Sequence, residues 1–594
     1  MTGTALPFFE GAFDIGRGGA ATLEAGGSQA LRHDAQDVQV LAFGRIHLKD
    51  AGLAALEREQ GLGVALAEGW RRHGAELPAQ VSGEYLLAAW CPAERRGLVA
   101  VDRFSTYSLF FAERDGRLAF STRPGQVCAL LQMPAELDSR SVHAFVHFHM
   151  IPAPMSIYRG VRRLDVAEGV FVADGKAVAR RHWTPVFVED RPFDFEREKA
   201  AFMAALREGV AQAIEGVPRE KLGCFLSGGT DSSTIAGLVT EAYGAPARTF
   251  SIGFDVSGYD ESHYARIAAK RFGTQHTEYV LTPEDAEKGL DVLARTYEQP
   301  FGNSSAVPSY FCARIAHDAG VERMLGGDGG DELYGGNERY AMQWLFSLYG
   351  HLPGALRTGV MEPLLLGPLR NTEFWPVRKA RGYVEQARVP LPDRLGSKYN
   401  LLTRFGAQNV FTEQLLAGAG GYDPVSTERE VWRACDAGSQ VNRLLAYDFK
   451  FTLGDNDLVK VTRMCHAAGV EVSFPMLCDA LTDHSLLLRP DQKLHRTKLR
   501  WFFKNALRGF LPDEIIEKTK HGFGMPFGDW LLLQPRLAAR AGGALEALAD
   551  RGMIRRSFLD ELNAAVRSGH AGFYGTMVWV LMMLELWLEA SHDR

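Results

Sequence analysis

The sequence predicts an α/β protein with two main parts, a sandwich of sheets followed by a parallel sheet with helices on both faces. Three observations support this prediction. The length of 594 residues favours more than one domain. Short apolar runs separated by turn residues fill the first part of the chain, which is typical of packed sheets. After about residue 195, helical and strand patterns alternate, which is typical of parallel βα units.

In the first part, the strands are expected where apolar or alternating runs are bounded by turn residues. These runs are 38–43, 84–90, 97–102, 108–112 and 117–121. The charged, proline-containing stretch 185–192 is the best candidate for a linker. We therefore predict one domain over residues 1–188 and a second over residues 193–594.

In the second part, the pattern predicts helices over 195–215, 234–242 and 262–272, and strands over 221–226, 247–253, 277–281 and 321–325. From residue 337 onward the pattern is mostly helical, with a helical insertion at about 345–440. The segment 352–408 has the least regular pattern. The apolar run 577–587 is too short to span a bilayer and contains Glu585, so it predicts a buried helix.

Bulk composition excludes several classes of function. The hydrophobic fraction of 46% and the charged fraction of 23% are those of an ordinary globular protein. A formal net charge of −6 provides no basic field for nucleic acid. Seven scattered cysteines without a CxxC pair fit a reducing compartment, and the first residues do not resemble a signal peptide. We expect a cytoplasmic protein with no nucleic-acid or membrane partner.

The first motif is Cys224-Phe-Leu-Ser-Gly-Gly-Thr-Asp-Ser-Ser233, between a predicted strand and a predicted helix. Free backbone N–H groups and the helix dipole make such a turn an anion site. Two glycines allow close approach of an oxyanion, and a carboxylate can hold Mg²⁺. The stretch resembles the pyrophosphate loop of ATP pyrophosphatases, and a simple Gly/Ser-rich helix cap is the alternative. Its candidate ligands are Ser227, Gly228, Gly229, Asp231, Ser232 and Ser233.

The second motif, Gly326-Gly-Asp-Gly-Gly-Asp-Glu-Leu-Tyr-Gly-Gly336, follows the predicted strand 321–325. Glycines interleaved with carboxylates leave the backbone of this acidic turn open. Asp231 and Asp331 both follow strands, so they are expected at the same edge of the sheet, where open α/β sheets bind ligands. An acidic surface turn or a Ca²⁺-type loop is the alternative.

The third motif is Lys518-Thr-Lys-His-Gly-Phe-Gly-Met-Pro-Phe527. We interpret Lys518 as a solvated surface charge. Lys520 lies closer to the Gly-Phe-Gly-Met-Pro turn, and its ammonium could stabilise charge developing on AMP and pyrophosphate.

Taken in order, these motifs resemble the asparagine synthetase family. Ser251-Ile-Gly-Phe-Asp255, Leu458-Val-Lys-Val-Thr-Arg-Met464 and Gly469-Val-Glu-Val-Ser-Phe-Pro475 add to the resemblance, as do Gly83–Trp90 and Val101-Asp-Arg-Phe104 in the first part. The resemblance implies an Ntn-type αββα sandwich followed by a parallel-sheet ATP-pyrophosphatase domain with a helical extension. It also implies ATP and Mg²⁺ as cofactors and adenylation of a carboxylate with release of pyrophosphate.

The same resemblance implies roles for single positions. Leu226 and Ile252 would contact adenosine, and Gly326 and Gly327 would line the nucleotide. Pyrophosphate and metal would be held by Ser227, Gly229, Asp231 and Ser232. Asp331 would be the second metal carboxylate, Asp328 would face the substrate, and Lys520 would stabilise the transition state. Lys460 and Arg463 match a basic pair near the active site, with structural salt bridges as the alternative.

The first part departs from the family's glutaminase pattern. Those glutaminases use an N-terminal cysteine after Met1 is removed, whereas position 2 here is Thr2. The family's Asn-Gly-Glu-Ile-Tyr-Asn stretch reads Phe43-Gly-Arg-Ile-His-Leu48, and the Ser-Asp glutamine clamp is missing between Asp50 and Gly69. Cys91 lies in a predicted strand, where a structural role is expected. We therefore predict an inactive glutaminase domain with no nucleophile.

Without a glutaminase, the acyl-adenylate must meet another amine. Family members with a silent N-terminal domain, the lasso peptide cyclases and β-lactam synthetase, use an amine of the substrate itself. We favour a lasso-peptide-cyclase-like amide former, with asparagine synthesis or a non-catalytic nucleotide-binding homologue as alternatives. Asp455 or Asp457 could serve as general base, or could simply cap a helix. Expected partners are a small-molecule or precursor-peptide carboxylate, an amine, and a second copy of the chain or a maturation protease.

Overall fold

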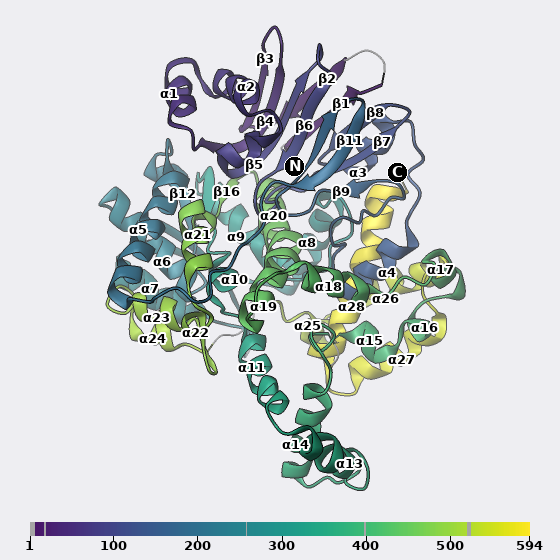
Figure 1. Ribbon diagram of the computed structural model, residues 1–594. Coiled ribbons are helices and arrows are strands. Elements are labelled where there is room, and N and C mark those ends of the chain that lie inside the picture. The colour runs from purple at the N-terminus through teal and green to yellow at the C-terminus, as the bar shows by residue number, and fades with distance from the viewer. Residues whose placement is uncertain (1–5, 17–19, 257, 397–399, 520–523, 594) are drawn as a thin grey trace.

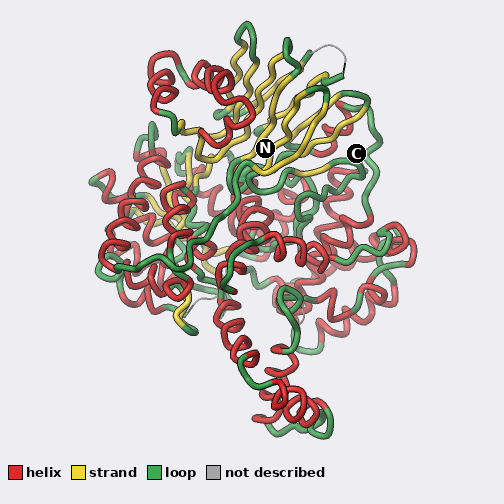
Figure 2. Tube along the Cα trace, viewed as in Figure 1, coloured by secondary structure: helices red, strands yellow, loops and turns green. Residues whose placement is uncertain are grey.

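The computed structural model describes residues 6–16, 20–256, 258–396, 400–519 and 524–593. Strands of two antiparallel sheets gather at the top of the molecule, and helices dominate the part below them (Figures 1 and 2). The first sheet has the strand order β2-β1-β8-β7-β9, and the second has the order β11-β10-β6-β5-β4-β3. The predicted sandwich is therefore confirmed.

The sandwich contains more strands than the sequence predicted and also helices, and the strands predicted at 38–43 and 84–90 are longer in the structure. The strands are β1 Phe8–Asp14, β2 Ala21–Gly26, β3 Ala30–Asp34, β4 Gln39–Leu48, β5 Val81–Cys91, β6 Arg96–Val101, β7 Phe110–Arg114, β8 Arg117–Ser121, β9 Arg162–Arg163, β10 Glu168–Ala173 and β11 Lys176–Arg181. The helices are α1 Ala51–Gln60, α2 Leu62–His73, α3 Pro124–Leu130 and α4 Ser139–Phe148.

Three apolar layers hold the sandwich together. Between the sheets, Phe13 stacks on Trp90 at 4.6 Å between ring centroids. A second layer lies between the β4–β5–β6 sheet and α2, where Leu66 is fully buried. The third lies between the other sheet and α3 and α4, around Phe110 and Phe145. This helix–sheet–sheet–helix order is the expected αββα architecture.

The second sheet system is the predicted parallel sheet, with strand order β14-β13-β12-β15-β16. Its strands are β12 Leu222–Phe225, β13 Arg248–Phe254, β14 Gln275–Leu281, β15 Arg323–Leu325 and β16 Glu471–Ser473, and every pairing among them is parallel. β16 was not predicted, because a three-residue run gives no periodic signal. The helices packed with this sheet are α5 Phe195–Ile214, α6 Thr230–Tyr243, α7 Ser262–Phe272, α8 Pro283–Thr296 and α9 Ala306–Asp318.

The remainder is helical, as predicted. Its helices are α10 Gly330–Tyr334, α11 Glu338–Gly350, α12 Gly354–Leu356, α13 Glu362–Leu366, α14 Trp375–Ala387, α15 Leu401–Phe405, α16 Ala407–Val410, α17 Glu413–Gly418, α18 Pro424–Ala434, α19 Gln440–Asp448, α20 Leu458–Ala468, α21 Asp479–Leu487, α22 Pro490–Lys493, α23 Trp501–Ala506, α24 Asp513–Glu517, α25 Phe527–Leu533, α26 Pro535–Asp550, α27 Arg556–Arg567 and α28 Ala571–Trp587. The π-helical segment η4, Phe449–Asp457, joins α19 to α20, and the short strands β17 Leu494–His495 and β18 Lys498–Leu499 form a hairpin.

The helices α11 to α14 extend away from the body as an arm with its own small apolar cluster (Figure 1). Among the described residues, the helical segment Ala571–His592 alone has the length and apolarity to cross a membrane, with mean hydropathy 1.4. Of that window, 78% is buried inside the protein, and a core helix passes the same test. The buried C-terminal helix predicted around 577–587 is thus confirmed.

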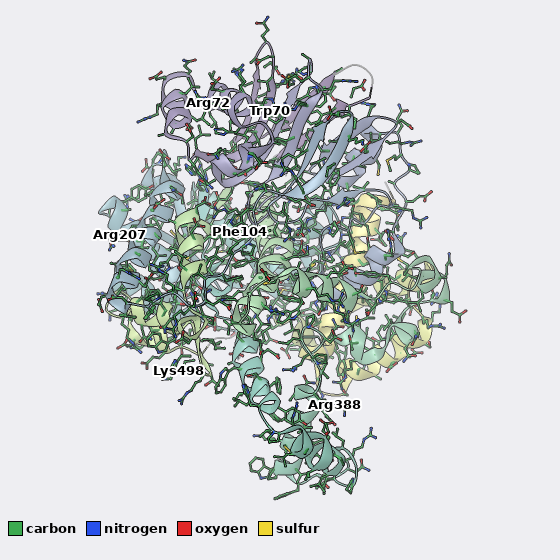
Figure 3. The ribbon with its side chains drawn as sticks, viewed as in Figure 1. Trp70, Arg72, Phe104, Arg207, Arg388 and Lys498 are labelled. Carbon is green, nitrogen blue, oxygen red and sulfur yellow. The ribbon has the colours of Figure 1, made fainter. Side chains whose placement is uncertain are left out.

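The sandwich rests directly on the parallel-sheet part. Phe104, labelled in Figure 3, lies at the junction and packs edge-on against Trp183 and Phe449. Nearby, the buried carboxylate of Asp455 pairs with Arg163 at 2.9 Å and with Lys450 at 3.1 Å. Apolar and ionic contacts therefore both fix the two parts relative to each other.

Candidate functional site

The first motif forms the turn between β12 and α6. Helix α6 begins at Thr230, four residues earlier than the sequence predicted, because Gly229 adopts an extended cap conformation. Gly228 has φ +72°, and a Cβ there would lie 2.4 Å from the backbone N of Ala265. The turn thus requires glycine both for its backbone angle and for its close approach to α7.

Hydroxyl groups organise this turn. The Ser232 hydroxyl accepts the backbone N–H of Ser227 at 3.2 Å and lies 3.1 Å from the Ser227 hydroxyl. Ser227 is exposed, whereas Ser233 is fully buried and its hydroxyl has no hydrogen-bond partner among the described residues. Ser227 and the N-terminal N–H groups of α6 therefore present donors at the surface of the turn, which suits an anion.

The second motif meets the first at the carboxyl edge of the sheet, as predicted. A Cβ on Gly327 would lie 2.9 Å from the backbone N of Ser232, and one on Gly330 would lie 2.4 Å from Oδ1 of Asp231. These glycines let the turn after β15 lie directly against the start of α6. The two loops consequently form one continuous site.

A single guanidinium joins the two predicted metal carboxylates. Nη1 of Arg500 donates to Asp231 Oδ2 at 2.7 Å, to Asp331 Oδ1 at 2.8 Å and to the Thr230 hydroxyl at 3.0 Å. Nη2 contacts the other oxygen of Asp231, and the Arg500 side chain is only 5% exposed. Although burial by itself lowers the pKa of an arginine, the two carboxylates raise the pKa of Arg500, so it is a permanent cation.

This arrangement shows that the carboxylates converge on one cationic position. One nitrogen of Arg500 reaches both of them at hydrogen-bond distance. Asp231 and Asp331 therefore fit as ligands of a divalent cation such as Mg²⁺, which is commonly bound by one or two carboxylates together with phosphates. Arg500 could not be identified from the sequence, because it follows a short hairpin and has no motif of its own.

A second charged group lies next to these loops. Lys460 at the start of α20 pairs with Asp457 at 2.7 Å, and its charge also acts on Asp328. Burial is the main cause that raises the pKa of Asp328 to about 6; Lys460 opposes the shift, and Asp457 and Asp231 add to it. Asp328 can thus exchange a proton near neutral pH, which suits a group beside the reacting atoms.

The structure changes or decides the roles suggested for three charged residues, Asp455, Arg463 and Lys518. Asp455 is held in the buried pairs with Arg163 and Lys450, so it is not available as a general base. Arg463 forms a buried ion pair with Glu298, which supports the structural alternative for that residue. Lys518 is not a solvated charge.

The Lys518 ammonium contacts Glu261 at 3.0 Å and lies 4.5 Å from the centre of the Tyr264 ring, with only 8% of the side chain exposed. The prediction failed because the partner carboxylate, from the N-cap residue Glu261, and the ring of Tyr264, in the first turn of α7, are far away in the sequence. Lys520 and Thr2 lie outside the described residues.

The predicted adenosine contacts lie beside the loops. Leu226 directly follows β12 and is 1% exposed, and Ile252 lies in the neighbouring strand β13 and is 9% exposed. Gly326 follows β15. All three are therefore at the carboxyl edge of three adjacent strands, where an adenine ring would lie against apolar side chains.

The positions that depart from the glutaminase pattern are occupied by packed side chains. Phe43 is 4% exposed and packs edge-on against Tyr107 and His466, at 5.1 and 6.4 Å between ring centroids. Arg45 pairs with Glu84 and donates to the hydroxyl of Ser473. Cys91 is buried, in keeping with the structural role predicted for it.

Comparisons with known proteins cover nearly the whole chain. The profile of the asparagine synthase family matches residues 202–589, and that of the glutamine amidotransferase domain matches residues 63–183. A Mycobacterium tuberculosis protein, provisionally named a glutamine-hydrolyzing asparagine synthetase, is 27% identical over 89% of this chain and 79% of its own length. Glutamine-hydrolyzing asparagine synthetase 1 of Bacillus subtilis is 22% identical over 78% of this chain and 71% of its own length.

Proposed function

This chain belongs to the asparagine synthase family, and we propose that it forms an amide with an amine that its own N-terminal domain does not release from glutamine. As a family member it is an ATP-dependent carbon–nitrogen ligase that produces AMP. The ATP first converts a carboxylate into an acyl-adenylate, and an amine then attacks the acyl carbon. The open question is the source of that amine.

The packed side chains of Phe43 and Arg45 are the main support for this proposal. Where the family pattern has an Asn and a Glu, Phe43 is buried against Tyr107 and His466, and Arg45 is paired with Glu84. A free glutamine needs polar partners for its amide and its amino-acid group, and an unpaired polar group costs about 1–3 kcal/mol on burial. These contacts therefore support a domain that does not bind glutamine.

For the ATP site, we propose roles that follow from the geometry. Ser227, Ser232 and the first N–H groups of α6 would hold the pyrophosphate, and Asp231 and Asp331 would hold Mg²⁺. The ion would neutralise phosphate charge while bound. The chain's own groups would orient the nucleotide, and the family resemblance assigns to Lys520 a positive charge that would stabilise the transition state.

The favoured substrate class is a molecule that carries both the carboxylate and the amine, as in a lasso-peptide-cyclase-like macrolactam former. Holding both groups in one site would replace a bimolecular step by an intramolecular one. Asparagine synthesis from aspartate is the second candidate, supported by the relatives with that name. The seven free cysteines support a cytoplasmic setting.

The decisive experiment measures pyrophosphate release and asparagine formation by the pure protein with ATP, Mg²⁺ and aspartate, supplied with glutamine or ammonium in turn. We expect no product with glutamine. Asparagine formed with glutamine would overturn the proposal, and asparagine formed with ammonium alone would select the second candidate. If neither amine gives release, a synthetic peptide with a free N-terminus and an internal Asp or Glu should give pyrophosphate and a product lighter by one water.

A further inference from the structure

The sandwich holds the edge strand of the parallel sheet. β16 is the last strand of that sheet and lies next to β15. Glu471 in β16 accepts from the Ser28 hydroxyl at 2.6 Å and from the Gln29 side chain at 3.1 Å. On its other side the same carboxylate pairs with Arg323 of β15 at 2.9 Å. Contacts from the sandwich thus reach the strand that lies beside the nucleotide loop.

The strongest of these contacts involves the ion pair Arg45–Glu84. The two residues are direct partners across β4 and β5, and their side chains are only 14% and 12% exposed. Gly44 and Gly83 beside them have φ +94° and +101°, and a Cβ on either would lie within 2.3 Å of a backbone oxygen of the opposite strand. The close strand crossing that these glycines permit fixes the direction of both charged side chains.

Glu84 extends this pair to the end of β16. Its Oε1 accepts the backbone N–H of Phe474 at 2.8 Å and the Ser473 hydroxyl at 2.9 Å. Arg45 contacts the same Ser473 hydroxyl and donates to the carbonyl of Ala213, at the end of α5, at 3.2 Å. Burial would raise the pKa of Glu84, but Arg45 and these hydrogen bonds outweigh burial and lower it, so the carboxylate stays charged.

The residues held by Glu84 touch the nucleotide loop directly. The Ser473 carbonyl accepts the backbone N–H of Gly326 at 2.8 Å. Gly326 lies in close contact with two side chains. A Cβ on Gly326 would be 3.0 Å from the ring of buried Phe474 and 2.9 Å from a carboxylate oxygen of Asp328. Any shift of Ser473 and Phe474 would therefore move the turn at Gly326 and Asp328.

We propose that Arg45 and Glu84 are positioning residues for ATP, which hold the Gly326–Asp328 turn in place through Ser473 and Phe474. In this role the N-terminal domain is a working part of the ATP site even without a glutaminase. Arg45 stands where the family pattern has a Glu, so the same residue that departs from the glutamine pattern makes the new contact. The proposal depends only on ATP binding, and it stands whichever amine the enzyme uses.

The test is the dissociation constant of ATP, measured by calorimetry on the full chain with Mg²⁺. Glu84→Gln keeps the size and one acceptor oxygen but removes the charge, so we expect ATP to bind about tenfold more weakly, an energy of about 1.4 kcal/mol. Arg45→Met should weaken binding at least as much. Arg45→Lys retains the positive charge. We expect it to bind ATP within about twofold of the wild-type affinity, because charge-assisted bonds supply most of the strength of the contact with Glu84.

Lys49→Met is the matched control. Lys49 forms an ion pair across the same domain junction, with Asp479 at 2.6 Å, but within the described part of the chain it makes no hydrogen bond or ion pair with β16 or Phe474. It should leave ATP affinity unchanged, and the melting temperatures of this variant and of Glu84→Gln report how far each one loosens the junction. If a charge variant fails to fold, Phe474→Leu tests the same path without burying a lone charge, and it too should weaken ATP binding.

Two results would overturn the proposal. One is unchanged ATP affinity in folded Glu84→Gln or Phe474→Leu protein. The other is an equal loss of affinity in Lys49→Met, which would indicate a general effect of loosening the junction. Neither result bears on the amine source, which the product assay tests separately.

Discussion

Arg500→Met is the most informative change to the ATP site. It removes a side chain that hydrogen-bonds to both Asp231 and Asp331. Methionine fills a similar volume and can still pack against Phe503, whose ring centre lies 3.7 Å from the guanidinium carbon. The perturbation is therefore mainly electrostatic.

The size of the effect follows from the geometry. The two carboxylate oxygens lie 2.7 and 2.8 Å from one nitrogen, so they are at most about 5.5 Å apart. Two unit charges at this separation repel by about 3 kcal/mol at an effective dielectric constant of about 20, and Arg500 offsets this repulsion in the wild type but not in Arg500→Met. For a cooperative unit of ~400 residues with an unfolding entropy of about 2.1 cal/mol/K per residue, that loss lowers Tm by about 4 °C.

A divalent cation should reverse this loss, because it can take the position that the guanidinium leaves. We expect Arg500→Met to melt about 4 °C below the wild type in EDTA and to recover most of that difference in MgCl₂, whereas the wild type should respond little without nucleotide. Differential scanning fluorimetry measures both quantities. Arg508→Met is a suitable control, since Arg508 pairs with Asp513 at the surface.

An Arg500→Met protein that melts like the wild type in EDTA would show that the carboxylates do not repel across this site. A lower Tm that Mg²⁺ fails to raise would show that Asp231 and Asp331 cannot hold the ion. Either outcome would refute the assignment of these two residues as a cation site.

Three further predictions concern the loops and the N-terminus. Burial raises the pKa of Asp328 from 3.8 to about 6. The stability linked to its protonated form is therefore complete below pH 3.8 and is lost as the pH rises through 6. Asp328→Asn should consequently melt above the wild type at about pH 7 but not at about pH 3.5. Gly327→Ala places a Cβ 2.9 Å from the Ser232 nitrogen and should weaken ATP binding at least about tenfold by calorimetry, unlike Gly359→Ala, whose Cβ meets nothing within 4 Å. Thr2→Ala should leave the rate of amide formation unchanged, and a glutamine-dependent loss of product would show an active glutaminase.

The convergence of the two acidic motifs could be predicted from the sequence, since Asp231 and Asp331 each follow a parallel strand and such strands end at one edge. The length of α6 could not, because the extended conformation of Gly229 decides where that helix begins. Arg500 was missed for a different reason. Its partners are 269 and 169 residues away, and only tertiary packing brings them together.

Buried charges were also hard to predict from the sequence. Asp455 and Lys518 looked like a general base and a surface charge, yet each is paired inside the fold. When the partner of a carboxylate or an ammonium is distant in the sequence, the pattern suggests a surface charge or a catalytic group instead of a buried ion pair. The structure shows instead that these charges fix the domain junction and the start of α7.

The departures at Phe43 and Arg45 have one structural cause, and this leads to a last prediction. The two residues are separated by one position on β4, so their side chains lie on the same face of the strand. Phe43 meets His466 of α20, and Arg45 meets Ser473 of β16, so both contact the ATP-binding part. Phe43→Asn alone should therefore not give glutamine-dependent product.

The reason is that the remaining pocket would still be filled. Arg45 would keep its pair with Glu84, and a buried asparagine at position 43 would face the rings of Tyr107 and His466. Restoring the family's Glu at position 45 would place two carboxylates opposite each other and remove the contact of Arg45 with the Ser473 hydroxyl. Glutamine binding and correct placement of the ATP loop thus require different side chains at the same positions of β4. Glutamine-dependent product from Phe43→Asn would refute this reasoning.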